Sequence, residues 1–195
     1  MEGEPPSAVI LAGPNGAGKS TLASSLLVDV LRVSEFVDAD ALARSLPRSE
    51  AAAVTAGRAV LRRLDELAAA RQSFAFETTL ASRSFAPRIR WLKVYGYECH
   101  LAFLWLPSAD LAVARVEDRV RRGGHAVPAE TVRRRYRSGL LNFFGLYRSL
   151  TTTWRMYDNS ADAPRLIAAG AGATTLAVND APAWRRIWAG VSHEG

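Results

Sequence analysis

The chain has 195 residues, of which 49% are hydrophobic and 23% are charged. This length and composition predict a single globular domain over residues 1–195, and no apolar run is long enough to span a membrane. The only cysteine, Cys99, excludes an internal disulfide and lies among apolar residues, so we expect a buried structural thiol in a cytoplasmic protein.

The formal net charge is +6, and only Lys19 and Lys93 of the 25 basic residues are lysines. The preference for arginine has two explanations, a bias in genomic composition and the suitability of the guanidinium group for phosphate recognition. The charge alone would permit nucleic-acid binding. No nucleic-acid motif accompanies it, so nucleic acid is not an expected partner.

The first predicted elements enclose a phosphate-binding motif. An apolar run over residues 8–12 predicts a buried strand, and residues 21–27 predict a helix. Between them, Gly-Pro-Asn-Gly-Ala-Gly-Lys-Ser (13–20) has the P-loop spacing G-x-x-x-x-G-K-S/T, in which backbone N–H groups and a helix N-terminus surround phosphate. ATP and Mg²⁺ are therefore the expected cofactors, with Lys19 on the outer two phosphates and Ser20 on the metal ion. The residues expected to bind ATP are Gly13, Pro14, Asn15, Gly16, Ala17, Gly18, Lys19, Ser20 and Thr21.

The rest of the chain alternates predicted strands and helices. Strands are predicted at residues 35–37, 73–76, 99–106 and 154–157, and helices at 49–71, 84–95, 109–122, 128–148 and 182–190. Residues 166–168 and 174–178 are typical of a closing hairpin. This order predicts an α/β protein with the three-layer P-loop NTPase or kinase fold and a central, mainly parallel sheet.

Polar clusters follow several of the predicted strands. They are the phosphate loop, Asp38 with Asp40, Glu77 to Thr79, and Asp158 with Asn159. Ligands of parallel sheets bind at the carboxyl ends of the strands, so these clusters are expected to line one rim.

Asp40, just past the second predicted strand, is the candidate general base for an attacking hydroxyl. The alternative is that Asp40 caps a helix beginning at Ala41, which is a common role of aspartate. Asp38 is the weaker candidate for the base and is otherwise structural.

Glu77 ends an apolar strand, in a chain where no apolar run ends in the Asp-Glu pair of a Walker B motif. Three roles are open for it: holding Mg²⁺ through water, holding a substrate hydroxyl, or forming backbone hydrogen bonds as a buried carboxylate. Thr78 and Thr79 are expected to bond either the ligand or the backbone. We assign Glu77, Thr78 and the nearby Arg83 to the substrate side of the site.

Eight arginines lie within residues 115–137. Arg115, Arg119 and Arg122 recur at helical spacing and precede a Gly-Gly pair, which predicts a helical arginine-rich lid that closes over transferring phosphates. Arg119 and Arg122 are the catalytic candidates among them. The alternative is a solvated charged face. His125 is expected either to contact phosphate or substrate, or to be structural.

Six short motifs occur in order along the chain: Gly13–Thr21, Phe36–Asp40, Glu77–Ser82, Arg121–Pro128, Arg133–Tyr136 and Tyr157–Ser160. Together they resemble the zeta-toxin family of P-loop kinases, in its compact predicted-ATPase branch, over about residues 8–165. The resemblance implies an enzyme that uses ATP and Mg²⁺ to phosphorylate UDP-N-acetylglucosamine, and a small antitoxin that blocks the ATP site.

The resemblance also implies residue roles by motif position. Asp40 matches the family's catalytic aspartate, Lys19 its phosphate lysine and Glu77 its substrate-side glutamate, whereas the lid arginines match by region only. We assign Asn159, from the last motif, to the nucleotide.

The sequence therefore predicts an ATP-dependent kinase that transfers the γ-phosphoryl group to a hydroxyl of a small molecule, such as UDP-N-acetylglucosamine or another nucleotide sugar. One alternative is a different acceptor, an antibiotic or a nucleoside. Another is an ATP-binding switch or interaction module with little catalysis. A base at Asp40 argues against the switch, which has no need of one.

Overall fold

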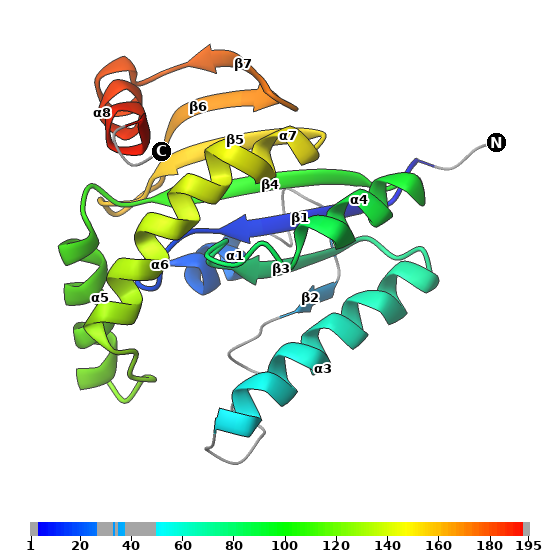
Figure 1. Cartoon of the computed structure of the whole chain (residues 1–195), viewed down its shortest axis with the longest axis horizontal. Coiled ribbons are helices and arrows are strands. Elements are labelled where there is room, and N and C mark those ends of the chain that lie inside the picture. The colour runs from blue at the N-terminus through cyan, green and yellow to red at the C-terminus, as the bar shows by residue number, and fades with distance from the viewer. Residues whose placement is uncertain (1–3, 27–32, 34, 38–49, 193–195) are drawn as a thin grey trace.

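The computed structural model describes residues 4–26, 33, 35–37 and 50–192 (Figure 1). Within this part of the chain, seven strands form one sheet in the order β2-β3-β1-β4-β5-β6-β7. The strands are β1 (Ser7–Ala12), β2 (Glu35–Val37), β3 (Phe74–Thr78), β4 (Glu98–Trp105), β5 (Thr153–Asp158), β6 (Arg165–Ala171) and β7 (Thr174–Val178). Strands β1 to β5 pair in parallel, and β6 and β7 add an antiparallel edge. The predicted mainly parallel sheet and its closing hairpin are confirmed.

The helices occupy most of the connections between strands. They are α1 (Lys19–Leu26), α3 (Glu50–Ala69), α4 (Ala86–Val94), α5 (Ala109–Arg121), α6 (Ala129–Asn142), the π-helical η1 (Phe143–Tyr147), α7 (Arg148–Leu150) and α8 (Ala181–Ser192). None of the helices formed by the described residues has the length and apolarity needed to cross a membrane.

Helices cover both faces of the sheet, because successive side chains of a strand point to opposite sides. Along β1, Ala8, Ile10 and Ala12 belong to a large core that includes residues of α3, α4, η1 and α8. Val9 and Leu11 face the other way and pack with Ala23 of α1. Figure 1 shows α4 and α6 in front of the sheet and α1 behind it. These layers are those of the predicted three-layer fold.

The register of the parallel strands brings their carboxyl ends to one edge. Strand β1 lies between β3 and β4, and its last residue, Ala12, pairs with Thr78 on one side and Phe103 on the other. On β5, Asp158 pairs with Trp105 of β4. The loops that follow β1, β3, β4 and β5 therefore start side by side, which is the arrangement that the polar clusters predicted.

Two elements differ from the predicted ones. Strand β3 continues to Thr78, so Glu77 lies within the strand and not after it. The helix predicted over 128–148 is divided into α6, η1 and α7. The wide π-helical turn buries Phe143, Phe144 and Tyr147, and Phe143 meets Trp154 edge-on with ring centroids 5.6 Å apart. Aromatic packing against the sheet has therefore reshaped this segment.

Candidate active site

The phosphate loop joins β1 to α1 and is held from several sides. Backbone hydrogen bonds run from Gly13 N to the Thr78 carbonyl (3.2 Å) and from Ala17 N to the Pro14 carbonyl (3.1 Å). Gly13 has a φ of +144°, and a Cβ there would lie 2.4 Å from the Leu104 carbonyl oxygen. Only glycine lets the loop pass this close to β4. The result is a fixed, backbone-lined turn of the kind that surrounds phosphate.

Lys19 is the first residue of α1 and is only 8% exposed. Its Nζ donates hydrogen bonds to the carbonyl oxygens of Gly13 (3.0 Å) and Pro14 (3.1 Å). These bonds fold the ammonium group back over the loop and satisfy a charge that burial would otherwise penalise. The cation and the positive end of the α1 dipole consequently lie at the same cavity wall.

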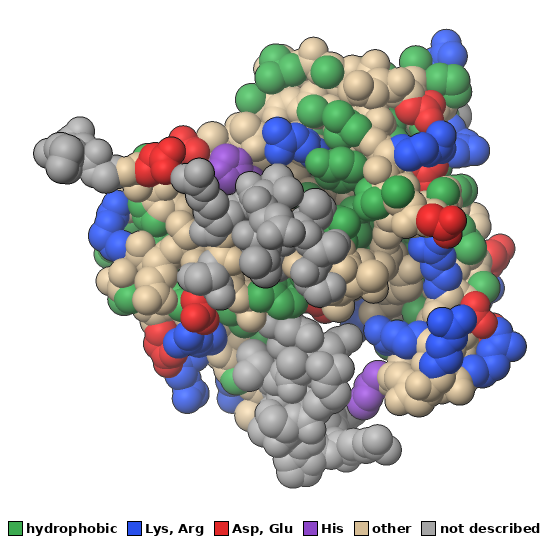
Figure 2. Space-filling view, turned by 180° about the vertical axis from the view of Figure 1, so that it is seen from behind, with side chains coloured by type: hydrophobic (Ala, Val, Ile, Leu, Met, Phe, Trp, Pro, Cys, Tyr) green, Lys and Arg blue, Asp and Glu red, His purple; other side chains and the backbone are tan. Residues whose placement is uncertain are grey.

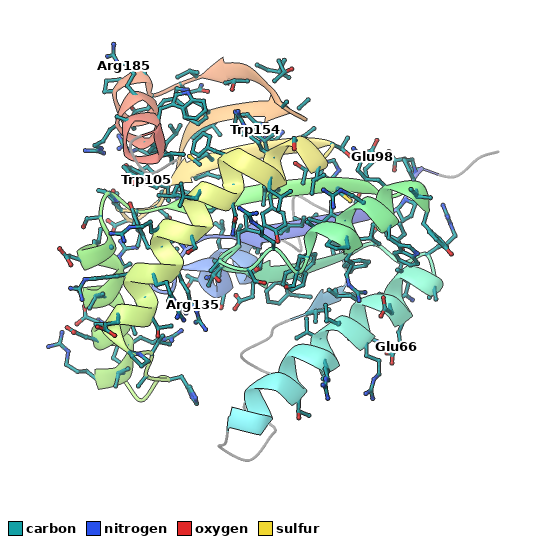
Figure 3. All side chains as sticks on the ribbon, viewed as in Figure 1. Glu66, Glu98, Trp105, Arg135, Trp154 and Arg185 are labelled. Carbon is teal, nitrogen blue, oxygen red and sulfur yellow. The ribbon has the colours of Figure 1, made fainter. Side chains whose placement is uncertain are left out.

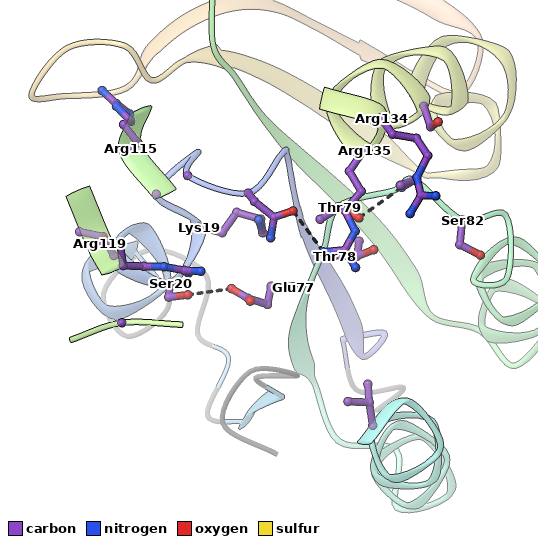
Figure 4. Close-up of a pocket in the computed structure, with 18 of the residues that line it drawn as sticks. Lys19, Ser20, Glu77, Thr78, Thr79, Ser82, Arg115, Arg119, Arg134 and Arg135 are labelled. Atoms are coloured by element: carbon purple, nitrogen blue, oxygen red, sulfur yellow. Dashed lines mark hydrogen bonds between the residues drawn. The ribbon is translucent and has the colours of Figure 1, made fainter. Parts of the chain in front are cut away.

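Ser20 and Glu77 meet at the next position of the site. The Ser20 hydroxyl donates a 2.9 Å hydrogen bond to Glu77 Oε2, which Figure 4 marks with a dashed line. Glu77 is 9% exposed, and its strand position opposite Leu11 of β1 aims it at the start of α1. This geometry favours the metal-side role for Glu77 among the three that the sequence left open.

The pair has the chemistry that Mg²⁺ requires. A hydroxyl and a carboxylate are hard oxygen ligands, and Mg²⁺ in kinase sites takes few protein ligands and keeps substrate phosphates and waters. No cluster of three or more His, Cys, Asp or Glu side chains that could enclose a metal occurs among the residues described. Ser20 and Glu77 therefore fit a Mg²⁺ ion shared with phosphate better than a fully protein-enclosed ion.

A cavity of about 1220 Å³ opens in front of these residues. Six basic side chains and two carboxylates line it: Lys19, Arg115, Arg119, Arg122, Arg134 and Arg135, with Glu77 and Asp118. Figure 2 shows a group of Lys and Arg side chains on the α5 side of the molecule, among others elsewhere on this face. Such an excess of positive charge in a cleft attracts polyanions and suits a polyphosphate ligand.

The end of α5 and the turn after it form one wall of the cavity. Arg119 extends toward Ser20 and Glu77 (Figure 4), and its Nη2 donates a 3.0 Å hydrogen bond to the His125 carbonyl. Arg122 follows α5 and also lines the cavity, as does Gly123, whose φ of +85° ends the helix. His125 contributes its backbone to Arg119 and is not among the described residues lining the cavity.

Arg115 has a different position from the other two members of the predicted stripe. Its guanidinium donates 2.8 Å hydrogen bonds to the carbonyl oxygens of Asn159 and Ser160. The Asn159 side chain in turn donates a 2.6 Å bond to the Ala17 carbonyl. Arg115 and Asn159 together brace the phosphate loop against the end of β5. A direct contact of Asn159 with the nucleotide stays a prediction.

Asp158 holds the turn at the end of β5 that Arg115 also contacts. Burial opposes ionisation of this carboxyl, but hydrogen bonds from Ser160 and Arg165 outweigh it and lower the pKa of Asp158. Its Oδ2 accepts a 3.0 Å bond from Arg165 of β6. The carboxylate stays charged and holds the turn after β5 in place.

Helix α6 supplies basic residues of the predicted arginine-rich region for which the sequence predicted no individual role. Arg134, Arg135 and Ser138 line the cavity from the side opposite α5, and Figure 4 shows both arginines above Thr79. Arg135 also donates a 3.2 Å hydrogen bond to Asn15 of the phosphate loop. The one-, three- and four-residue spacing of these positions marks a helix face and could have identified them.

The loop after β3 uses its polar side chains locally. The Thr78 hydroxyl accepts a 3.1 Å bond from Leu80 N, although Thr78 also lines the cavity. Arg83 lies outside the described cavity lining, and its Nε donates to Asn142 Oδ1 of α6 (3.2 Å). Asn142 also donates a 2.8 Å bond to the Leu80 carbonyl. The assignment of Arg83 to the substrate therefore remains a prediction from sequence, while the structure gives it a role in shaping the loop.

The two candidate bases, Asp38 and Asp40, lie outside the described residues. Their roles remain predictions from the sequence.

The sequence model of the family described as Zeta toxin matches residues 1–160, close to the range spanned by the six motifs. The chain belongs to the zeta toxin family. An uncharacterized protein of Haemophilus influenzae is 30% identical to it over 131 residues, which cover 66% of this chain and 91% of that protein.

Solved structures share the fold of this zeta toxin family member. The AvrRxo1-ORF1:ORF2 complex with ATP superimposes with a TM-score of 0.70 at 17% identity, covering 95% of this chain and 64% of that chain. This chain thus spans somewhat less than two thirds of that protein. The PezAT toxin–antitoxin system of Streptococcus pneumoniae gives a TM-score of 0.61 at 17% identity, covering 84% of this chain and 73% of that chain. At these identities the likeness concerns the fold alone.

Proposed function

We propose that the protein is an ATP-dependent kinase that transfers the γ-phosphoryl group of ATP to a hydroxyl of a small molecule. The observation that carries the proposal is the Ser20–Glu77 hydrogen bond beside the buried Lys19, at the wall of an arginine-rich cavity. Membership of the zeta toxin family supports an ATP-dependent phosphotransferase. A general base at Asp40 would separate this enzyme from a pure binding module, which has no need of one.

Each group at the cavity has a role in this proposal. The loop N–H groups and Lys19 bind the outer phosphates, and Arg119 and Arg122 stabilise the charge that spreads over the transferring group. Ser20 and Glu77 hold Mg²⁺, which supplies further positive charge to the phosphates when bound. Arg115 and Arg135 support the phosphate loop in this proposal, through their hydrogen bonds to the Asn159 carbonyl and to the Asn15 side chain.

Asp40 completes the proposal as the general base that accepts the proton of the acceptor hydroxyl. Asp40→Asn is expected to keep ATP affinity and to lower transfer by about 10²–10⁴-fold, the usual contribution of acid–base help. Unchanged transfer in Asp40→Asn together with a loss in Asp38→Asn would move the role to Asp38.

A nucleotide sugar is the acceptor that we propose, with UDP-N-acetylglucosamine as the first candidate. The cavity exceeds the roughly 300–1,000 Å³ typical of a single drug-sized ligand, which leaves room for a second ligand beside ATP. Residues of α6 and of the loop after β3 line the part away from α5, namely Ser82, Phe85, Arg134 and Ser138. The serine hydroxyls suit a sugar, the guanidinium group suits a diphosphate, and the phenyl ring suits a nucleotide base.

A small antitoxin protein that covers the ATP site is the partner that we propose. The two structural relatives above are both described as assemblies of two proteins. Co-expression with a small protein encoded beside this chain is expected to suppress its ATP turnover. Turnover that is unchanged by every such neighbour would argue against an antitoxin.

A transfer screen tests the proposed reaction and acceptor. Labelled ATP is incubated with Mg²⁺, the protein and panels of nucleotide sugars, nucleosides and aminoglycosides, with Lys19→Ala as the inactive control. Label is expected in a nucleotide-sugar product. Label in a nucleoside or an aminoglycoside would keep the kinase and overturn the acceptor, and no labelled product in any panel would overturn the kinase.

A further inference from the structure

A second cavity, of about 330 Å³, lies between the end of β4, α6 and α8. Its volume falls in the range of small-molecule pockets, roughly 300–1,000 Å³. Trp105 and Ile187 form a buried apolar floor, with Leu140 beside them. The cavity shares no lining residue with the arginine-rich cavity in front of the phosphate loop.

Positive charge surrounds this apolar floor. Arg133, Arg137 and Arg186 line the cavity, and no carboxylate is among the described residues that do so. Arg133 donates to Asp110, an exposed residue outside the lining, with a shortest N–O distance of 2.8 Å. Among the described residues, the lining thus combines guanidinium groups at the rim with an apolar interior.

Arg186 is held in a defined orientation. Its guanidinium carbon lies 5.0 Å from the centroid of the Trp105 ring. A guanidinium placed over an aromatic face keeps its planar fork of donors, which matches a planar carboxylate in two parallel hydrogen bonds. Burial raises the pKa of the neighbouring Tyr136 to about 12, and its hydroxyl donates a 2.7 Å bond to the Leu106 carbonyl, so this group stays neutral beside the arginines.

We propose that this cavity binds a small organic carboxylate whose body is aromatic or branched aliphatic. The carboxylate pairs with Arg186 at the rim, and the apolar body packs on the partly exposed Leu140, Leu141 and Val191, above the buried Trp105 and Ile187. A neutral apolar molecule would make no charged pair with Arg186, and a small inorganic anion would make no contact with the partly exposed apolar side chains of the lining. Two features of the cavity thus select one class of ligand.

Two variants of α8 test the charged rim and the space of the cavity separately. Arg186→Gln removes the charge and the planar fork while keeping a polar side chain. The matched control is Arg185→Gln, because Arg185 is exposed and projects away from the molecule, whereas Trp105 lies beneath α8 (Figure 3). Gly190→Leu narrows the cavity from the same helix, and an added Cβ at Gly190 meets no atom within 4 Å, so the fold should tolerate it.

The test is a calorimetric titration of the full chain with indole-3-propionate. Saturable binding of one molecule per chain is expected, at least about tenfold tighter than for the neutral indole-3-propionamide, because a charge-assisted pair is lost with the amide. Acetate, which lacks the apolar body, should not saturate. Arg186→Gln and Gly190→Leu should each weaken binding by about tenfold or more, while Arg185→Gln and Lys19→Ala keep it.

Four results would overturn the proposal. The acid and the amide bind equally well, or neither saturates at millimolar concentration. Arg185→Gln weakens binding as much as Arg186→Gln, which would show that the acid responds only to the net charge of α8. Mg-ATP displaces the acid while Arg186→Gln leaves its affinity unchanged, which would place the acid in the cavity of the phosphate loop.

Discussion

Ser20 and Glu77 are 57 positions apart in the sequence, yet the serine hydroxyl donates a 2.9 Å hydrogen bond to the glutamate. Parallel pairing of β1 with β3 creates this contact, because it places Glu77 opposite Leu11, near the end of β1 and just before the phosphate loop. A metal ion held by both oxygens would rest against the loop. The pair thus connects the fold directly to the proposed chemistry.

Glu77→Gln should retain the hydrogen bond from Ser20, since an amide oxygen also accepts, but it removes the negative charge. We expect kcat to fall and the Mg²⁺ concentration for half-maximal activity to rise by about tenfold, the loss typical of a weakened metal environment. Steady-state kinetics over a Mg²⁺ titration measures both. Glu66→Gln is the matched control, because Glu66 is an exposed residue of α3 (Figure 3) that does not line the cavity. An unchanged Mg²⁺ requirement in Glu77→Gln would return Glu77 to the substrate side.

Arg119→Ala should lower kcat by about 10³-fold or more if its guanidinium acts on the transferring group as an arginine finger does. Its position beside Ser20 and Glu77 is the reason to expect a larger effect than for other surface arginines. The kinetics of Arg122→Ala and of Arg90→Ala, an exposed position on α4, are measured alongside. Near wild-type kcat for both Arg119→Ala and Arg122→Ala would restore the solvated-face interpretation of the lid.

Arg115 is expected to act on stability and on ATP binding. Arg115→Lys keeps the charge but loses the two parallel hydrogen bonds to the Asn159 and Ser160 carbonyls. We expect unfolding to be easier by about 1–3 kcal/mol, and KM for ATP to rise more than kcat falls. Denaturant titration and steady-state kinetics on one preparation test this. A collapse of kcat at unchanged stability and KM would show that Arg115 touches the reacting groups.

Cys99 gives a pH-dependent prediction. It is fully buried in β4, and burial raises the pKa of its thiol from an ordinary 9.0 to about 11. The native state therefore holds the proton more tightly than the unfolded chain. Its contribution to stability is complete below about pH 9 and is lost as the pH rises toward about 11.

Two measurements check this behaviour. Iodoacetamide should modify Cys99 very slowly in the folded protein at neutral pH and rapidly in denaturant, because the thiolate is the nucleophile. Cys99→Ala should flatten the fall in unfolding free energy between pH 9 and 11. Rapid modification of the folded protein would show that the thiol is accessible.

The sequence predicted the order of strands and helices because β1 and β4 are mostly apolar runs, α5 has a helical pattern, and turn residues bound them. It did not predict the break in the helix over 128–148. Nothing in the local pattern of Phe143 to Tyr147 shows that these rings must meet Phe103 and Trp154, which lie on distant strands. Tertiary packing determines that segment.

Within the site, the phosphate loop was predictable because its function fixes the spacing of its glycines, Lys19 and Ser20. The roles of Arg115 and Asn159 were not, because both side chains bind backbone groups that only folding brings near. The contact of Arg135 with the phosphate loop was not predictable either, since its partner Asn15 is 120 positions away in the sequence. The type of a residue shows which bonds its side chain can make. The fold determines which group it bonds to.

The central claim, phosphoryl transfer at the phosphate loop, is tested most directly by ³¹P NMR of the protein with Mg-ATP and a nucleotide-sugar acceptor. A new phosphomonoester signal should grow in step with ADP, and Lys19→Ala, shown to be folded by circular dichroism, should produce neither. ADP that appears with inorganic phosphate alone would mean an ATPase, and ATP that stays intact with wild-type protein across the acceptor panels would mean a nucleotide-binding module. Either result would contradict the assignment of a kinase.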